Sequence, residues 1–199
     1  MIWWYAVHLG GALVFGYLLG SIPFGLVLTR IAGLGDIRKI GSGNIGATNV
    51  LRTGNKPLAA VVLLLDAAKG LAAVLLAVAI YGAVAGVAAA LGAVLGHMYP
   101  VWLQFKGGKG MATAIGVMGG LAWPLGAIAC AAWLAVAVLF RYSSLASLVS
   151  IAASAAASWA LLDPRAAAVV TFIAMLVWMR HRQNIHRLLA GTEPRIGQH

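Results

Sequence analysis

The hydrophobic positions of this chain form long runs that are separated by short polar segments. Apolar runs of this length indicate helices that cross a membrane, whereas a membrane β-barrel would show short segments of alternating polarity. The pattern predicts helices at about Trp3–Thr29, 57–80, 83–97 and Met111–Ala122, a fifth ending at Arg141, a sixth at Leu145–Leu162 and a seventh after Asp163–Arg165. We therefore expect an all-α polytopic membrane protein with a bundle of seven transmembrane helices.

The segment Met111–Ala122 leaves the number of crossings open. Its dozen residues would span about 18 Å as a helix, against a hydrocarbon core of about 30 Å, so it is either a short fourth helix or half of a longer one kinked around Pro124. A single crossing would place Arg141 and the basic tail outside, against the retention of Lys and Arg on the cytoplasmic side. Two crossings are therefore preferred, with the N-terminus outside and the C-terminus cytoplasmic.

Composition supports a membrane protein, because 62% of the 199 residues are hydrophobic, only 9% are charged and the mean hydropathy is +0.95. No repeat or linker interrupts the pattern, so a single domain over residues 1–199 is expected. The net charge of +10 is first explained by basic cytoplasmic loops, not by nucleic acid. Cys130 is the one cysteine, which excludes an internal disulfide.

Small residues recur one helical turn apart, at Gly16/Gly20, Gly82/Gly86, Gly92/Gly96 and Gly116/Gly120. This spacing lets membrane helices approach closely, so these glycines are expected to serve packing. Asp66 and Lys69 lie three residues apart and are expected to pair within the membrane. A structural role for the pair is favoured over a functional one.

The most polar loop is Gly41–Asn49, with the sequence GSGNIGATN, and Arg52 follows it. Glycines bring successive backbone N–H groups to an anion, and Ser42, Asn44, Thr48 and Asn49 add neutral donors, so phosphate is the expected ligand. The letters match the dinucleotide fingerprint G-x-G-x-x-G, but no buried strand precedes them and that interpretation is rejected. A plain connecting loop uses the same residue types and stays open as an alternative.

Three further polar segments fall on the same predicted side of the membrane. They are the loop Lys106–Gly110, Arg141 with Ser143 and Ser144, and the tail around His181 and Asn184. Cytoplasmic retention explains the basic residues, but it does not explain the glycines, hydroxyls, amides and histidine that accompany them. We expect the four segments to meet at the cytoplasmic rim of the bundle and to bind anionic substrates there.

Three of these segments resemble the motifs of the PlsY-type bacterial glycerol-3-phosphate acyltransferases. The motifs are Gly41–Asn49, Gly107–Thr113, and His181–Asn184 continuing to Gly191–Glu193, and the resemblance covers essentially the whole chain. Met111 stands where a smaller aliphatic residue is common. The resemblance implies a bacterial inner-membrane enzyme that transfers an acyl group from long-chain acyl phosphate to the 1-hydroxyl of glycerol 3-phosphate. The products would be 1-acylglycerol 3-phosphate and phosphate, in the first step of phospholipid synthesis, with membrane lipids as partners and no cofactor, metal or nucleic acid.

Two phosphorylated substrates repel each other, so the predicted site must supply several cations and N–H donors. Ser42, His181 and Asn184 are expected to be catalytic, with either His181 or a substrate phosphate accepting the hydroxyl proton. The expected binding residues are Asn44, Thr48, Asn49, Arg52, Lys106, Gly107, Gly108, Lys109, Gly110, Arg141, Ser143 and Ser144. Ser143 and Ser144 are alternatives for the hydroxyl that the family places beside Arg141, and Glu193 is expected to tie down the tail by pairing with a basic residue.

Two other functions fit parts of the pattern. A transporter of phosphorylated anions would also need a basic pocket, but transporters usually show paired halves and sites near the midplane, whereas the polar residues here gather on one predicted face. A non-catalytic membrane subunit would leave the predicted anion-binding residues without a role.

Overall fold

The computed structural model describes the backbone of residues 2–197 and the side chains of residues 7–197. The chain is helical, and no strand occurs among the described residues, so the expectation of an all-α protein is confirmed. The helices form two compact units, Met1–Leu121 and Ala122–His199.

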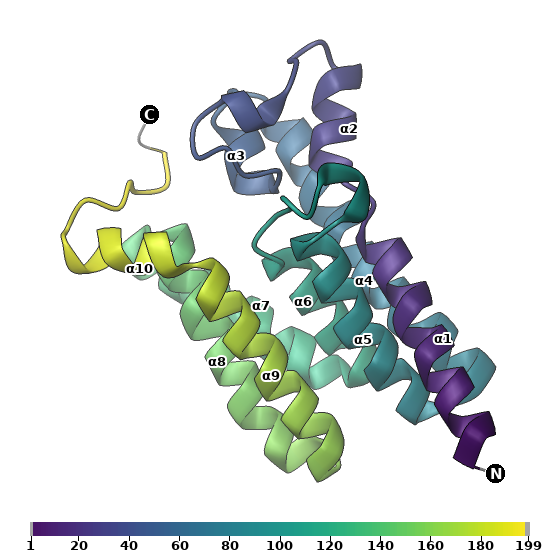
Figure 1. The fold of residues 1–199 in the computed structure, drawn as a ribbon. Helices are drawn as coiled ribbons and strands as arrows, with labels where there is room; N and C mark the ends of the chain where they lie inside the picture. The colour runs from purple at the N-terminus through teal and green to yellow at the C-terminus, as the bar shows by residue number, and fades with distance from the viewer. Residues whose placement is uncertain (1, 198–199) are drawn as a thin grey trace. The chain divides into compact units, whose positions relative to one another are not determined.

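The first unit holds α1 (Ile2–Gly20), α2 (Phe24–Ile31), the 3-10 turn η1 (Ile37–Lys39), α3 (Ala47–Leu51), α4 (Lys56–Tyr81), α5 (Ala83–Met98), the 3-10 turn η2 (Val101–Leu103) and α6 (Met111–Leu121). The second unit holds α7 (Trp123–Phe140), α8 (Ser143–Leu161), α9 (Pro164–Arg180) and α10 (Arg182–Leu189). In Figure 1, α1, α4, α5 and α6 lie side by side within the first unit.

The first predicted helix is wrong in one respect, because it is interrupted between α1 and α2. Pro23 lacks an N–H group and its ring opposes a continuous helix, which leaves nearby carbonyl groups without helical partners. Side chains supply the missing donors: Trp102 Nε1 lies 2.7 Å from the Ser21 carbonyl oxygen, and Lys69 Nζ lies 2.7 Å from that of Ile22. The interruption is therefore held by residues remote in sequence.

Glycines bring α1 against α5 as their spacing predicts. A Cβ atom on Gly16 or Gly20 would collide with the backbone of α5, and one on Gly92 or Gly96 would collide with the backbone of α1. Helices that approach this closely gain van der Waals contact in a membrane, where no hydrophobic effect drives their association. The packing role of these four glycines is confirmed. The same prediction is wrong for Gly82, which lies between α4 and α5 at a φ of +85°, where a Cβ would meet nothing within 4 Å.

The two helices α4 and α6 pack in the same manner. A Cβ on Gly116 would overlap the Ala67 carbonyl oxygen, and one on Gly70 would overlap that of Thr113. The short helix α6 is thereby fixed along the middle of α4, and the loop that precedes α6 is fixed with it.

Serine hydroxyls join the helices of the second unit. Ser150 Oγ donates to the Ala129 carbonyl at 2.8 Å, and Ser154 Oγ donates to the Leu125 carbonyl at 3.1 Å, so two buried residues of α8 bond to the backbone of α7. Such side-chain bonds between helices add to packing in an apolar environment.

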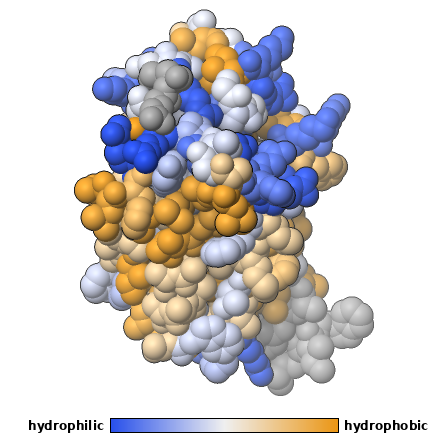
Figure 2. Space-filling model, turned by 90° about the vertical axis from the view of Figure 1, so that its left-hand side faces the viewer, coloured by the Kyte–Doolittle hydropathy of each residue, from blue (hydrophilic) through white to orange (hydrophobic). Residues whose placement is uncertain are grey.

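Five segments are long and apolar enough to cross a membrane: Val7–Ile31, Lys56–Tyr81, Ala83–Leu103, Trp123–Phe140 and Ser143–Leu161. On the face drawn in Figure 2, hydrophobic residues cover a broad band and hydrophilic residues gather beyond one end of it. This distribution is the one expected of a protein whose flanks contact lipid and whose loops contact water.

Candidate functional site

Asn49 organises the first polar loop. Its amide nitrogen lies 3.0 Å, 2.9 Å and 2.8 Å from the carbonyl oxygens of Ile37, Ile40 and Asn44, and its side chain is buried. Its Oδ1 accepts hydrogen bonds from the backbone N–H of Ser42 at 3.1 Å. A single buried side chain thus holds both arms of the loop, which is a structural use of a residue that the sequence predicts to bind substrate.

Two more predicted residues gather at the Asn49 carboxamide. Ser42 Oγ lies 3.3 Å from Asn49 Oδ1, and Arg52 Nη1 lies 3.3 Å from the same oxygen. Gly41 has a φ of +55°, in the left-handed region that favours glycine, and this lets the chain turn beside Arg52. Thr48, in the first turn of α3, is exposed. The loop therefore places a hydroxyl and a guanidinium next to each other.

An apolar cluster fixes the loop to the helices beneath it. Its buried members are Leu26, Ile37, Ile45, Val50, Ala59 and Val62. Leu103, which ends η2 just before the second polar loop, packs against the same cluster. Both polar loops of the first unit are therefore anchored to the same apolar cluster.

The second polar loop, Lys106–Gly110, folds back onto the end of α5. The backbone N–H of Gly107 donates to the Met98 carbonyl at 3.1 Å, and that of Gly108 donates to the His97 carbonyl at 3.0 Å. Gly110 has a φ of +84°, and α6 begins at the next residue, Met111. The loop thus leads directly into the N-terminus of an apolar helix, where backbone N–H groups favour an anion.

His181 lies where α9 meets α10, and its side chain is buried. Its Nδ1 atom lies 2.8 Å from the Val177 carbonyl oxygen. A carbonyl oxygen can only accept a hydrogen bond, so in the neutral imidazole Nδ1 carries the proton and Nε2 carries the lone pair. The helix backbone thereby sets the tautomer that can take up a proton at Nε2.

Glu193 joins the segment that follows α10, residues 190–197, to α8 and to α10 itself. Ser144 Oγ donates to Glu193 Oε1 at 2.7 Å and Asn184 Nδ2 donates to the same oxygen at 2.6 Å, while Arg187 Nε lies 2.7 Å from Oε2. Burial alone would raise the pKa of Glu193, but the hydrogen bonds from Ser144, Asn184 and Arg187 outweigh it and lower that pKa. The carboxylate fixes the orientation of the Asn184 amide.

The backbone of Ile196 joins residues 190–197 to Arg141. Its N–H donates to the Arg141 carbonyl at 2.6 Å, and Arg141 Nη2 donates to its carbonyl at 3.2 Å. Arg141 itself is exposed and has a φ of +62°. The predicted site residues thus fall into two sets, those of the two loops in the first unit and those around Glu193 and His181 in the second.

Sequence reasoning did not single out His97, which is buried at the end of α5. Its ring lies against Gly108, because a Cβ on that glycine would overlap the ring. Its Nδ1 lies 3.5 Å from Asp66 Oδ1, and Asp66 pairs with Lys69 as their spacing predicts, at 2.6 Å. A histidine within an apolar run was the available signal, since polar residues inside membrane helices are often functional.

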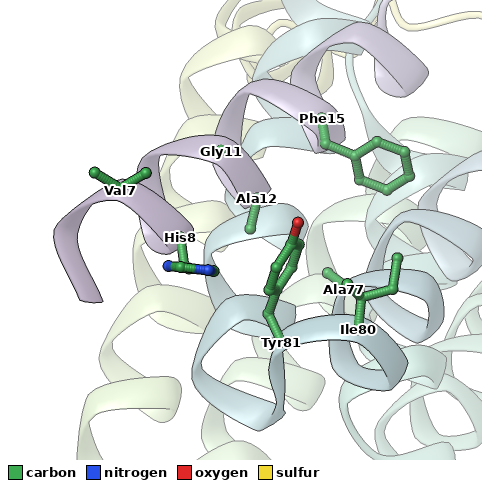
Figure 3. A pocket seen from close by; sticks show the side chains of 8 residues that line it. All are labelled: Val7, His8, Gly11, Ala12, Phe15, Ala77, Ile80 and Tyr81. Carbon is green, nitrogen blue, oxygen red and sulfur yellow. The ribbon is translucent and has the colours of Figure 1, made fainter. Parts of the chain in front are cut away.

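A pocket in the first unit lies far from these loops. It has a volume of about 330 Å³ and is lined by Val7, His8, Gly11, Ala12, Phe15, Ala77, Ile80 and Tyr81, near the start of α1 and the end of α4 (Figure 3). The His8 and Tyr81 rings meet edge to face, with centroids 4.9 Å apart. Because α4 begins at Lys56, after the first polar loop, and reaches the pocket only at Ala77, roughly 30 Å of helix separates the two.

Comparison with known proteins gives consistent results. Residues 11–191 match the sequence profile described as glycerol-3-phosphate acyltransferase. The glycerol-3-phosphate acyltransferase of Mesorhizobium japonicum is 62% identical over 186 residues, covering 94% of this chain and 95% of that protein. That of Rhodospirillum rubrum is 56% identical over 200 residues, covering 96% of this chain and 93% of its own.

Solved structures agree with the sequence matches. The crystal structure of PlsY, an integral membrane glycerol 3-phosphate acyltransferase, in its glycerol 3-phosphate form superposes with a TM-score of 0.90 at 40% identity, over 95% of this chain and 96% of that one. Its lysophosphatidic acid form superposes with a TM-score of 0.87 at 38% identity, over 95% of each chain. Because the matching sequence profile spans most of this chain and the relatives are this similar along nearly their whole length, the chain belongs to the glycerol-3-phosphate acyltransferase family.

Proposed function

We propose that this acyltransferase joins the acyl group of a long-chain acyl phosphate to the 1-hydroxyl of glycerol 3-phosphate. The hydroxyl oxygen attacks the acyl carbonyl carbon, the bond from that carbon to the phosphate oxygen breaks, and inorganic phosphate leaves. The product is 1-acylglycerol 3-phosphate. A mixed anhydride has a good leaving group, so positioning and charge stabilisation can carry the reaction without an enzyme nucleophile.

The observation that carries this proposal is the second polar loop and its continuation into α6. Gly108 and Gly110 are buried, Lys106 and Lys109 supply positive charge, and the first turn of α6 supplies backbone N–H groups. This is the chemistry that a phosphate dianion requires. We assign the phosphate of the acyl donor to Lys106–Gly110, with the acyl chain extending among apolar side chains.

The first loop and Arg141 receive glycerol 3-phosphate in this proposal. Ser42 and Arg52 are adjacent through their shared contact with Asn49, so a hydroxyl and a guanidinium can bind one phosphate together. Asn44 and Thr48 add neutral donors. Asn49 contributes by holding Ser42 and Arg52 in place.

His181 acts as the base. Because Val177 fixes Nδ1 as the protonated nitrogen, Nε2 is the atom that accepts the hydroxyl proton. Asn184, whose amide is oriented by Glu193, aligns the hydroxyl. Ser143 and Ser144 both remain alternatives for the hydroxyl beside Arg141, and Ser144 also donates to Glu193.

The proposed setting is one catalytic domain in the inner membrane of a bacterium. Seven crossings, with the N-terminus outside and the C-terminus inside, place the basic loops in the cytoplasm. Five apolar spans support part of this topology, and α6 and α9 would supply the two remaining crossings.

The test uses the purified full chain in detergent, supplied with palmitoyl phosphate and glycerol 3-phosphate. We expect stoichiometric release of phosphate and formation of 1-palmitoylglycerol 3-phosphate. Release without acylation of glycerol 3-phosphate would identify a different acceptor. Uptake of a phosphorylated anion into vesicles without turnover would identify a carrier and refute the proposal.

The loop assignment is tested separately with Gly108→Val, because a side chain there meets the His97 ring. We expect the KM for palmitoyl phosphate to rise at least about tenfold, while the KM for glycerol 3-phosphate changes little. Gly10→Val is the control, since nothing lies within 4 Å of a Cβ at Gly10. An unchanged KM for palmitoyl phosphate in Gly108→Val would reject the assignment.

A further inference from the structure

Three buried polar side chains form a continuous row inside the first unit. Lys69 Nζ lies 2.6 Å from Asp66 Oδ1, and His97 Nδ1 lies 3.5 Å from the same oxygen. The side chains of Lys69 and Asp66 are each 2% exposed and that of His97 is 4% exposed. The row thus crosses from α4 to α5 within the apolar part of the protein.

One end of the row holds the interruption between α1 and α2. Lys69 Nζ donates to the Ile22 carbonyl at 2.7 Å and lies 5.6 Å from the centre of the Phe24 ring. The Ile22 carbonyl, which also accepts the Phe24 N–H at 3.1 Å, thus gains a charged donor beside the helix break. The ammonium is therefore fixed on three sides, by Asp66, Ile22 and Phe24.

The other end of the row supports the second polar loop. The Nε2 edge of the His97 ring lies against Gly108, and the His97 carbonyl accepts the Gly108 N–H at 3.0 Å. With Nδ1 facing Asp66, the ring has one orientation, and that orientation places Nε2 under the loop. Rotation of this ring would change the surface on which Gly108 rests.

The stability of the folded protein is a weak explanation for three polar side chains buried in a row. Replacing a buried ion pair by apolar residues of similar size is often neutral or stabilising, because desolvation offsets most of the attraction. What an apolar replacement cannot supply is the carboxylate that faces His97 Nδ1 at 3.5 Å. The row therefore has a use beyond holding helices together.

We propose that Asp66, Lys69 and His97 are positioning residues that hold Gly107–Gly110 in the conformation that receives the phosphate of the acyl donor. Lys69 fixes Asp66, Asp66 fixes the imidazole, and the imidazole forms the floor under Gly108. The proposal rests on the assignment of this loop to the acyl phosphate made above. None of the three side chains needs to touch substrate.

The test compares two double variants that remove the same charges. Asp66→Leu with Lys69→Met removes the ion pair and the carboxyl oxygen that faces His97. Asp66→Asn with Lys69→Met removes the ion pair but keeps an oxygen facing His97. Neither variant leaves an unpaired buried charge, so both are expected to fold.

The two variants are expected to differ in one kinetic constant. The Leu/Met variant should raise the KM for palmitoyl phosphate about tenfold, as expected from loss of one buried orienting contact, while the Asn/Met variant stays within about twofold of the parent. The KM for glycerol 3-phosphate and the Tm should agree between the two variants. Equal KM values for palmitoyl phosphate in both variants would overturn the proposal.

A second comparison keeps the inference testable if either double variant fails to fold. His97→Asn retains a group at the position of Nδ1 but no longer reaches Gly108, whereas His97→Gln retains length toward the loop. Hexadecylphosphonate, which cannot transfer its chain, is titrated calorimetrically into each. We expect about tenfold weaker binding for the Asn variant than for the Gln variant, and equal affinities would contradict the floor role of the ring.

The two proposals fail in different ways. If unmodified protein binds hexadecylphosphonate with the same affinity as Gly108→Val, the loop does not hold the donor phosphate and the proposed function loses its binding site. If Gly108→Val weakens binding but the Leu/Met variant does not, the loop assignment stands and the positioning role is wrong.

Discussion

The Nδ1 atom of His181 lies 2.8 Å from the carbonyl oxygen of Val177, one helical turn earlier in the chain. This contact orients the buried imidazole through the helix backbone. In many enzymes a carboxylate both orients a catalytic histidine and stabilises its charged form. At His181 the Val177 carbonyl performs this orientation, and in the proposed reaction it leaves Nε2 as the atom that accepts the proton.

The first prediction concerns His181→Gln. Glutamine cannot serve as a base at neutral pH, so we expect kcat to fall roughly hundredfold, within the range that general-base catalysis contributes. Both KM values should change only a few-fold. The measurement is phosphate release under saturating concentrations of both substrates.

His186→Gln is the matched control for that variant, because His186 is an exposed histidine of α10. Its kcat should equal that of the parent. Similar activities for the two variants would show that the proton goes elsewhere, with a phosphate oxygen of the substrate as the remaining acceptor.

A second prediction separates two asparagines of the first loop. Asn49→Asp replaces an NH₂ group that faces three carbonyl oxygens by an oxygen, so repulsion replaces hydrogen bonding and the free energy of unfolding should fall by roughly 3 kcal/mol. Asn44 uses only its Oδ1 in the described contact, accepting from the Gly46 N–H at 3.1 Å. Asn44→Asp keeps that acceptor and should leave the Tm nearly unchanged. Thermal unfolding in detergent measures both, and matching Tm values would exclude Asn49 as the organiser of the loop.

A third prediction tests the glycine contact between α1 and α5. In Gly16→Ala the new methyl group meets the Ala89 backbone, and overpacking of this kind costs about 1–3 kcal/mol. Gly10→Ala, on the same helix, meets nothing within 4 Å and should be neutral or slightly stabilising, because alanine favours the helix. Thermal unfolding of the two variants gives the comparison. A lower Tm for Gly10→Ala than for Gly16→Ala would mean that α1 and α5 pack through other residues.

The helices were predictable because their signal is local. Apolar runs between polar loops marked α4, α5, α8 and the short α6, each within about two residues of its observed end. The break after Gly20 was not predicted, although Pro23 stands in the sequence. Proline is tolerated in membrane helices when other groups satisfy the freed carbonyls, and here those groups come from Lys69 and Trp102, remote in the chain.

For the candidate site, too, local features were predictable and contacts between residues remote in the chain were not. Glycines, hydroxyls and cations in the loops predicted phosphate binding, although a plain connecting loop uses the same residue types. The role of Asn49 inside its loop and the place of His97 beneath Gly108 depend on contacts that no spacing rule supplies. Ser144 and Glu193 likewise meet across 49 residues of chain. The sequence pattern therefore predicted a chemistry for these loops, and the fold shows which residue supports another.

The last prediction concerns the acid sensitivity of the tail. The pKa of Glu193 is lowered in the folded protein, from an ordinary value of about 4.5, because the bonds from Ser144, Asn184 and Arg187 outweigh the effect of burial. A lowered folded pKa means that the carboxylate contributes stability above the ordinary value and loses it as the pH falls through the folded one. Protonation of Glu193 should therefore loosen residues 190–197 in a pH range below about 4.5.

Glu193→Gln tests this directly. The amide still offers one oxygen, but it loses the ion pair with Arg187, so faster hydrogen exchange of residues 190–197 is expected already at neutral pH, by a factor of about ten for each 1.4 kcal/mol lost. Arg187→Gln should produce the same change, whereas Arg182→Gln, an exposed arginine of the same helix, should not. After correction for intrinsic rates, exchange in the unmodified protein should approach that of Glu193→Gln as the pH is lowered. If exchange in the unmodified protein keeps the same protection throughout that range, Glu193 does not hold the tail, and the orientation of Asn184 must be set by another group.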